Sequence, residues 1–447
     1  MLINFTLENW MSFRDKTAFS MIASEERQHS DRLSYIKKYN LKINPIASIY
    51  GANASGKSNL LEAFKFAKNL ILNVKNKDEK ILRKPFKLEV DTLNKPSLFI
   101  FEILIKETIY EYSFAVDNEM VHYERLTEIK AKEEVTIFDR KEDHIQLCDA
   151  IKDIEKANAD STKPNELFIA KAIFNNTKCK SFILIDQWFR RRLYLDLNFR
   201  NIPLHALTAY DNKDYAEITI RLCSLIVKYI DQGITKLKVV ERPMEIEMID
   251  PSEYQDLIGN IKKWGFGIHK SGHIVTYNES NELVEKKVTP FHKNSLGQEI
   301  PFEYKDESDG TRKFLSLLPV LMPFLIPPVH EGRVLIIDEL DRSFHTLLSR
   351  AILQLICAIS TKSNRSQLIF STHDVDLMDQ ELLRRDEMWI TEKDAYGVSK
   401  LYSIGDFEGI RNDKKLDKMY LRGQIGGTPE IDIQKLIELI QELRESL

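Results

Sequence analysis

The sequence predicts an α/β fold with an antiparallel β subdomain and a mainly helical insertion, and three observations carry this prediction. A short, mostly apolar segment, 44–50, is followed at once by a glycine loop and then by a helical spacing of apolar residues over 58–74. Residues 333–337 are almost entirely apolar, as expected for a strand buried on both faces of a parallel sheet, and two acidic residues follow them. Segments 98–104 and 110–114 are rich in β-branched and aromatic residues, which is typical of antiparallel strands.

The remaining elements follow from the periodicity of the chain. Residues 1–8 largely alternate apolar and polar side chains and lack a basic segment before an apolar run, so they predict a strand and not a signal peptide. The pattern is mainly helical from about 150 to 229, and strand-like pieces return at 237–240 and 273–277. Apolar residues between 433 and 443 share one face of a final helix, which predicts a turn followed by a packing helix.

The length of 447 residues corresponds to about three domains at roughly 150 residues each, and one large split domain also fits. We predict four segments, whose boundaries follow the changes of pattern. They are an N-terminal lobe with the glycine loop and the β subdomain (1–145), a mixed, mainly helical insertion (146–300), a C-terminal lobe (301–405) and a helical tail (406–447).

The composition excludes several classes of protein. The formal charge is −4, from 64 Lys and Arg against 68 Asp and Glu, which excludes a polybasic nucleic-acid binder of the histone kind. The four cysteines stand singly, without CxxC pairs, so we predict neither a disulfide framework nor a zinc site and expect the reducing cytoplasm. The most apolar stretch, 314–329, is interrupted by four prolines, so no membrane-spanning helix is expected.

The strongest chemical signal is the segment Gly51-Ala52-Asn53-Ala54-Ser55-Gly56-Lys57-Ser58, a complete match to the pattern GxxxxGK[ST] between a predicted strand and a predicted helix. Small residues let such a loop wrap closely, so that backbone N–H groups and the helix N-terminus point at phosphate oxygens. We expect Lys57 to reach the β- and γ-phosphates of ATP and the Ser58 hydroxyl to ligate Mg²⁺. A chance glycine turn is the alternative, and the matching context disfavours it.

Two further strands end in residues suited to nucleotide chemistry. Asp338 and Glu339 follow the strand 333–337, and ligands sit at the carboxyl ends of parallel strands. We expect Asp338 to hold the Mg²⁺ shell and Glu339 to polarise the attacking water. The apolar strand 367–371 is followed closely by His373, whose imidazole could hydrogen-bond the γ-phosphate or the water. Each feature alone is also typical of an ordinary strand end, and the phosphate loop favours the chemical interpretation.

Upstream of these strands, Glu307-Ser308-Asp309-Gly310-Thr311 places Ser and Gly at the start of an apolar helix. Free N–H groups and the helix dipole favour an anion at such a position, while a simple N-cap is the alternative for Ser308.

In this order and spacing, the motifs resemble the ABC-type P-loop ATPase heads of the SMC-like and RecF-like branch. Segment 307–311 resembles the signature motif of that branch, Asp341 its D-loop and His373 its switch histidine. More narrowly, segments 9–13 and 385–390 are similar to AAA-family ATP-binding proteins of bacterial restriction-linked and phage-defence loci, RloA-like, with the PARIS ATPase subunit and OLD-family ATPase regions as cousins.

The resemblance implies a cytoplasmic ATPase in which two heads enclose ATP and Mg²⁺. It also implies a homodimer or higher homo-oligomer and an effector protein, such as a nuclease, as partner. No association with a membrane is expected. Glu339 and His373 would be catalytic, and Ser58 and Asp338 would hold the metal. The expected nucleotide-binding residues are Gly51, Asn53, Ala54, Ser55, Gly56, Lys57, Ser58, Asn59, Ser308, Gly310, Thr311 and Asp341.

The sequence departs from the transporter signature LSGGQ, because Asp309 replaces its first glycine, and this disfavours coupling to a membrane transporter. Only about 75 residues follow His373, too few for the C-terminal nuclease domain of OLD proteins.

Two alternative functions stay open. One is a nuclease with its catalytic site in the insertion, although no dense group of carboxylates or histidines supports it there. The other is a RecF-like DNA-repair ATPase without long heptad arms. The cluster 188–194 mixes aromatic residues with arginines and leaves nucleic acid open as a partner, and a solvated or partner-binding helix face is the favoured reading of it.

Overall fold

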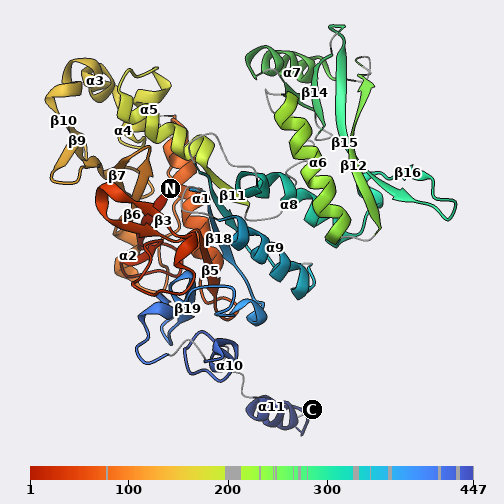
Figure 1. The fold of residues 1–447 in the computed structure, drawn as a ribbon. Helices are drawn as coiled ribbons and strands as arrows, with labels where there is room; N and C mark the ends of the chain where they lie inside the picture. Colours follow the sequence, from red (N-terminus) through yellow and green to blue (C-terminus); the bar gives the residue numbers. More distant parts are fainter. Residues whose placement is uncertain are drawn as a thin grey trace. The chain divides into compact units, whose positions relative to one another are not determined.

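The computed structural model describes residues 1–76, 79–196, 213–230, 233–244, 246, 249–264, 266–269, 273–278, 280–325, 332–342, 344–360, 365–410, 414–428 and 433–445. The chain forms two compact units, shown with their elements in Figure 1. The first unit comprises Met1–Leu195, Glu331–Leu340 and Thr361–Leu447, and the second comprises Asp196–His330 and Asp341–Ser360.

The first unit contains a six-stranded sheet with a parallel centre. Its strands, in spatial order, are β11 (Leu193–Asp196), β17 (Val334–Ile337), β18 (Gln367–Ser371), β5 (Ile46–Tyr50), β19 (Met388–Lys393) and β20 (Ser399–Ser403). Strands β17, β18, β5 and β19 run parallel, and every residue of the first three is buried. The chain segments that follow these strands therefore lie along one edge of the sheet.

A seven-stranded antiparallel sheet forms the other layer of the first unit. In spatial order it consists of β10 (His144–Leu147), β9 (Glu134–Lys141), β8 (Val121–Ile129), β7 (Thr108–Val116), β6 (Ser97–Ile105), β1 (Leu2–Glu8) and β2 (Thr17–Ser20). Helix α1 (Lys57–Leu72) packs on this sheet, because the ring of Phe64 lies 3.9 Å from that of Phe5 and 5.9 Å from that of Phe101.

The two sheets are joined by a buried side chain. Gln367, at the start of β18, accepts a 2.7 Å hydrogen bond from the Leu2 N–H and donates one of 2.9 Å to the Leu2 carbonyl. This pairing is equivalent to a short stretch of backbone ladder between β18 and β1, and it satisfies polar groups that would otherwise be buried without partners.

Shorter elements complete the first unit. They are α2 (Val90–Asn94), α3 (Asp149–Ser161), α4 (Phe168–Phe174), α5 (Lys180–Gln187), the π-helix η3 (Trp188–Arg192), α10 (Leu416–Leu421), α11 (Ile433–Glu445), the hairpin β3 (Ser34–Ile36) and β4 (Leu41–Ile43), and the 3₁₀ turns η1 (Ser30–Arg32), η2 (Lys37–Tyr39), η7 (Val375–Leu377), η8 (Arg385–Glu387) and η9 (Ile404–Asp406).

The second unit combines helices with a five-stranded antiparallel sheet. Its elements are α6 (Lys213–Ile230), β12 (Ile234–Pro243), α7 (Pro251–Trp264), β13 (Gly267–Ile268), β14 (Ile274–Tyr277), β15 (Leu283–Lys293), β16 (Glu299–Pro301), the 3₁₀ turn η6 (Tyr304–Asp306), α8 (Asp309–Leu325) and α9 (Thr346–Ile359). Leu257 and Ile261 of α7 form a buried cluster with Val275 of β14 and Leu283 of β15. The Cys223 thiol of α6 lies 3.7 Å from the Met322 sulfur of α8.

The predicted α/β class with an antiparallel subdomain is confirmed, and the strand-like pieces expected at 237–240 and 273–277 belong to β12 and β14. The boundaries of the four predicted segments stay a prediction. None of the helices in the described residues is long and apolar enough to cross a membrane.

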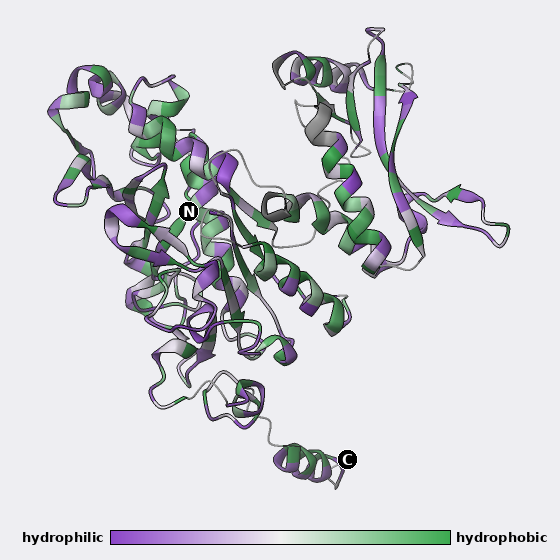
Figure 2. Cartoon of the chain, in the orientation of Figure 1, coloured by the Kyte–Doolittle hydropathy of each residue, from purple (hydrophilic) through white to green (hydrophobic). Residues whose placement is uncertain are grey.

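The C-terminal helix differs from its prediction. Helix α11 forms, but its apolar side chains are 43% to 65% exposed, and Figure 2 shows hydrophobic and hydrophilic residues along it. An amphipathic spacing determines which side chains share a face, but it does not specify what covers that face.

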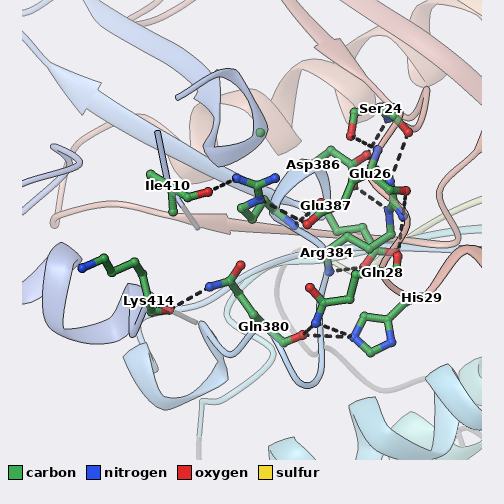
Figure 3. A network of polar contacts seen from close by, with 12 residues as sticks. Ser24, Glu26, Gln28, His29, Gln380, Arg384, Asp386, Glu387, Ile410 and Lys414 are labelled. Atoms are coloured by element: carbon green, nitrogen blue, oxygen red, sulfur yellow. Dashed lines mark hydrogen bonds and ion pairs between the residues drawn. The ribbon is translucent and has the colours of Figure 1, made fainter. Parts of the chain in front are cut away.

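Figure 3 shows a polar network that holds the N-terminal segment around Ser24 to Gln28 onto the turn that precedes β19. The Arg384 guanidinium, fully buried, donates to both carboxylate oxygens of Asp386, at 2.8 and 2.7 Å, and to the backbone carbonyls of Ser24, Glu26 and Gln28. Asp386 in turn accepts a hydrogen bond from the Ser24 N–H. These contacts give the segment 385–390, noted in the sequence, a structural role.

A second buried ion pair extends the network. The Arg32 guanidinium contacts the Glu387 carboxylate, with exposed fractions of 4% and 0%. Burial raises the pKa of Glu387 to about 7, while the guanidinium of Arg32 opposes that shift. Each of these two buried groups therefore depends on the other to replace the contacts with water that it lost on burial.

We predict that Arg384→Met destabilises the first unit by about 3 kcal/mol, because the buried Asp386 carboxylate loses its cationic partner and three carbonyls lose the guanidinium as a donor. Urea unfolding followed by tryptophan fluorescence measures this change. Lys130→Met is the control, since its ion pair with Glu133 is exposed and should contribute nothing measurable. Equal midpoints for the two variants would contradict the role assigned to the network.

Candidate functional site

The glycine loop lies between β5 and α1, as the sequence predicts, and its backbone requires small residues. Gly51 and Gly56 have φ values of 147° and 122°. A Cβ atom on Gly51 would lie 2.4 Å from the Thr391 carbonyl oxygen, and one on Gly56 would lie 2.5 Å from the Ser399 hydroxyl. The loop is therefore pressed against β19 and β20, and a side chain at either glycine would push it outward.

The loop forms a cradle suited to an anion. The Lys57 ammonium, 5% exposed, donates to the carbonyls of Gly51 at 2.7 Å and Ala52 at 3.1 Å, so it lies across the loop. Gly56 is the N-cap of α1, and no side chain caps the first turn. The N-terminal N–H groups and the lysine charge thus face the same place, as phosphate binding requires.

The other loop residues divide between exposed and buried positions. Asn53, Ala54 and Ser58 are exposed, whereas the Ser55 hydroxyl is buried at 2.6 Å from that of Thr391. The Asn59 side chain donates to the Ser12 hydroxyl at 2.7 Å. Ser58 is thus accessible from solvent, while Ser55 and Asn59 tie the loop to neighbouring segments.

Residues that the sequence interpretation did not assign to the site support the loop from behind. The Ser399 hydroxyl donates to the Ser55 carbonyl at 2.6 Å and lies 2.7 Å from the Ser12 hydroxyl. The Trp10 indole donates to the Asn59 carbonyl at 2.9 Å. Segment 9–13 had been noted only for its resemblance, and no local signal in the sequence relates it to Ser399.

The acidic pair follows β17 at the same sheet edge as the loop. In register, Ile337 lies opposite Phe370 on β18, and Ser371 lies opposite Ile49 on β5. One strand, β18, therefore separates Asp338 from the loop, a spacing of roughly 10 Å between β17 and β5. Fold and sequence together bring Asp338, Glu339, His373 and the phosphate loop to one edge.

Ser371 organises the acidic pair. Its hydroxyl donates to the Asp338 carboxylate and accepts a 2.7 Å hydrogen bond from the Glu339 N–H, and its carbonyl accepts one of 3.0 Å from Leu340. Glu339 adopts a left-handed conformation with φ of 52°, which is uncommon for a residue with a side chain. Ser371 therefore holds both the orientation of Asp338 and the turn that presents Glu339.

Glu339 lies beside His373. The Glu339 carboxylate is 3.9 Å from the His373 Nε2, and both side chains are more than one third exposed. A carboxylate and an imidazole at this separation can share a water molecule or form an ion pair when the imidazole is protonated.

The remaining predicted site residues belong to the second unit. Ser308 is exposed and precedes α8, its hydroxyl accepts a 3.1 Å hydrogen bond from the Thr311 N–H, and it lies 2.8 Å from the Thr311 hydroxyl. Gly310 lies in the first turn of α8, and Asp341 directly follows the last residue that the first unit contributes from this region. Ser308 thus acts as an N-cap, which was the alternative interpretation, and its exposure keeps the other interpretation open.

The basic cluster at 188–194 has two of its three aromatic members, Trp188 and Phe189, in the core, whereas Tyr194 is 37% exposed. Trp188 is 2% exposed and Phe189 is fully buried, with its ring 5.1 Å from that of Phe101, while Arg190 pairs with Asp186. The two rings are therefore not available to stack on bases, and the cluster is mainly a helix that packs through its aromatic side.

The residues at the sheet edge fit a magnesium ion held together with a nucleotide. Among the described residues, no group of three or more His, Cys, Asp and Glu side chains is placed to hold a metal by itself. Mg²⁺ commonly takes one or two protein oxygens and completes its shell with phosphate oxygens and water. The exposed Ser58 hydroxyl and the oriented Asp338 carboxylate are oxygen ligands of this kind.

One family model matches most of the chain. The family described as "AAA domain, putative AbiEii toxin, Type IV TA system" matches residues 46–379, from β5 through the phosphate loop to beyond His373. No curated protein matches the chain.

Two solved structures are similar over most of their length. The SMC head bound to the C-winged helix domain of ScpA is 14% identical, covers 90% of this chain and 97% of its own, and has a TM-score of 0.44. The SMC head domain from Thermotoga maritima is 13% identical, covers 90% of this chain and 98% of its own, and has a TM-score of 0.36.

We predict that Ser371→Ala lowers the rate of nucleotide hydrolysis about 10- to 100-fold while nucleotide affinity changes little, because Asp338 and Glu339 lose the hydroxyl that orients them. Steady-state phosphate release measures the rate. Ser48→Ala is the matched control, since Ser48 is equally buried in the same sheet but donates to the Glu387 carbonyl instead. A rate for Ser371→Ala equal to that of the control would remove Ser371 from the site.

Proposed function

The chain belongs to the AAA domain family whose description matches residues 46–379, and from this premise we propose that it is an ABC-type ATPase that binds ATP with Mg²⁺ and hydrolyses it. One observation carries the proposal. The cradle formed by Lys57 and the uncapped start of α1 shares a sheet edge with Asp338, Glu339 and His373. A charge-neutralising loop, a metal ligand and a general base are the parts that phosphoryl transfer to water needs.

Each residue has a role in this proposal. Lys57 neutralises the β- and γ-phosphates, and the backbone N–H groups from Gly51 to Ser58 hold them. Ser58 and Asp338 hold Mg²⁺, which, when bound, withdraws charge from the phosphate oxygens. Glu339 accepts the proton of the attacking water, and His373 donates a hydrogen bond to the γ-phosphate or the water.

The division of labour between the two carboxylates follows from their surroundings. Asp338 receives a hydrogen bond from Ser371, which fixes the orientation of its carboxylate, as a metal ligand requires. Glu339 projects from a left-handed turn towards His373 and is 37% exposed, so a water molecule can reach it. Glu339 is therefore the better general base of the two.

We extend the proposal to a composite site in which two copies of the chain enclose ATP. The phosphate loop of one copy would face Ser308, Gly310, Thr311 and Asp341 of the other. The exposed start of α8 supports this arrangement, because the first N–H groups and the dipole of that helix favour the γ-phosphate. ATP would then act as a ligand that joins two copies.

The last part of the proposal concerns the biological setting. We propose a head that drives or gates an effector protein, such as a nuclease, in bacterial anti-phage defence. The motif resemblance supports this setting, and so does the description of the matching family, which names a toxin of a type IV TA system. None of the four cysteines forms a disulfide, which suits the cytoplasm.

Glu339→Gln should bind ATP with unchanged affinity but hydrolyse it at least 100-fold more slowly, because the amide cannot accept the proton of the water. The variant should accumulate as an ATP-bound dimer or higher oligomer. Calorimetry gives the affinity, phosphate release the rate, and multi-angle light scattering the mass. Undiminished turnover would exclude Glu339 as the base.

The composite site is tested by mixing two inactive variants. Lys57→Ala removes the main phosphate charge, and Ser308→Arg places a bulky side chain where the partner's γ-phosphate would lie. A mixed dimer has one site with both defects and one with neither, so we expect mixing to restore part of the ATPase activity. Normal hydrolysis by Ser308→Arg alone would contradict the composite site and favour an isolated P-loop ATPase.

A further inference from the structure

A side chain of the antiparallel sheet in the second unit contacts the segment that precedes α8. His292, near the end of β15, has its Nε2 atom 2.8 Å from the Glu307 carboxylate. Glu307 directly precedes Ser308 in the sequence. The side chains of His292 and Glu307 are 19% and 5% exposed, so the contact is shielded from water.

The chain between β15 and α8 is held along its length. It returns beside β15 as β16 and continues with a 2.9 Å hydrogen bond from the Phe302 N–H to the Pro290 carbonyl and an ion pair between Glu303 and Lys287. The Phe302 ring then lies 4.1 Å from the His292 imidazole. Residues 299–303 are therefore fixed to the sheet before the chain reaches the signature-like segment.

The helix side of the contact is equally defined. The Tyr304 hydroxyl donates to the Arg312 carbonyl at 2.6 Å, and the Ser308 carbonyl accepts from the Arg312 N–H at 2.8 Å. The segment 304–312 thus folds back on its own first helical turn. Its remaining attachment to β15, among the contacts of the described residues, is the pair formed by His292 and Glu307.

We propose that His292 is a positioning residue that couples this sheet to Ser308, so that the second unit sets how readily two copies join around ATP. The proposal rests on the composite site proposed above. Because a carboxylate with 5% exposure depends on its partner for solvation, Glu307 follows the position of β15, and Ser308 follows Glu307. A partner that bends or straightens β15 would thereby change the affinity between copies.

Two substitutions separate the hydrogen bond from the ring contact. His292→Phe retains a ring against Phe302 but removes the bond to Glu307, whereas His292→Gln retains a donor for Glu307 and removes the ring. Both are made in the Glu339→Gln background, where ATP-dependent association is measured by sedimentation. Lys293→Met is the matched control, because its side chain is exposed and neighbouring residues of a strand point to opposite faces.

We expect His292→Phe to weaken ATP-dependent association about 5- to 100-fold, and His292→Gln and Lys293→Met to stay close to the parent. The affinity of the monomer for ATP should not change, because the phosphate loop belongs to the first unit. Association of His292→Phe as tight as that of the parent would overturn the proposal. If His292→Phe does not fold, Glu307→Gln replaces it in the same experiment. Because this variant keeps an acceptor but loses the charge, we expect a smaller loss of ATP-dependent association.

Hydrogen exchange separates this inference from the composite site. If copies of the parent protein do not associate with each other when ATP is added, the composite site is wrong. Amide exchange of the monomer still tests the role of His292 in that case. His292→Phe should then speed exchange at Thr311 and Arg312, whose N–H groups bond to Ser308, relative to Lys293→Met. Unchanged exchange at both amides would overturn the positioning role.

Discussion

The parallel register of three strands is the constraint on which the rest of the site depends. Strand β18 pairs with β5 on one side and with β17 on the other. Three strands from distant parts of the sequence therefore end at the same edge of the sheet. Ser371 lies at the end of the central strand and bonds to both residues of the acidic pair. A shift of β18 by one residue would reverse its side chains and move Ser371 away from Asp338.

Strands β19 and β20, on the other side of β5 from β18, support the phosphate loop. The loop touches β19 and β20 so closely that a Cβ on Gly51 or Gly56 would collide with Thr391 or Ser399. The placement of β19 depends in turn on the buried network of Arg384, Asp386 and Glu387 around the turn before it (Figure 3). Buried charges far from the phosphate loop thus contribute to its shape, because they hold the strand against which the loop rests.

The second unit adds a different kind of constraint. Its sheet and helices form their own core, and the start of α8 is fixed within that unit by Tyr304, Glu307 and His292. The hydrogen bonds given for the Ser308 turn come from Thr311 and Arg312, which belong to the same unit.

The α/β class, the glycine loop after β5 and the acidic end of β17 could be predicted from the sequence, because they depend on short-range sterics and on hydrophobic periodicity. Only the tertiary structure decided the roles of Ser371, Ser399 and Trp10, since hydrogen bonds between distant segments depend on which strands pair. It also showed that Trp188 and Phe189 are core residues, and that the apolar face of α11 is exposed. Local patterns specify an element and its faces, whereas the contacts of those faces are a property of the whole chain.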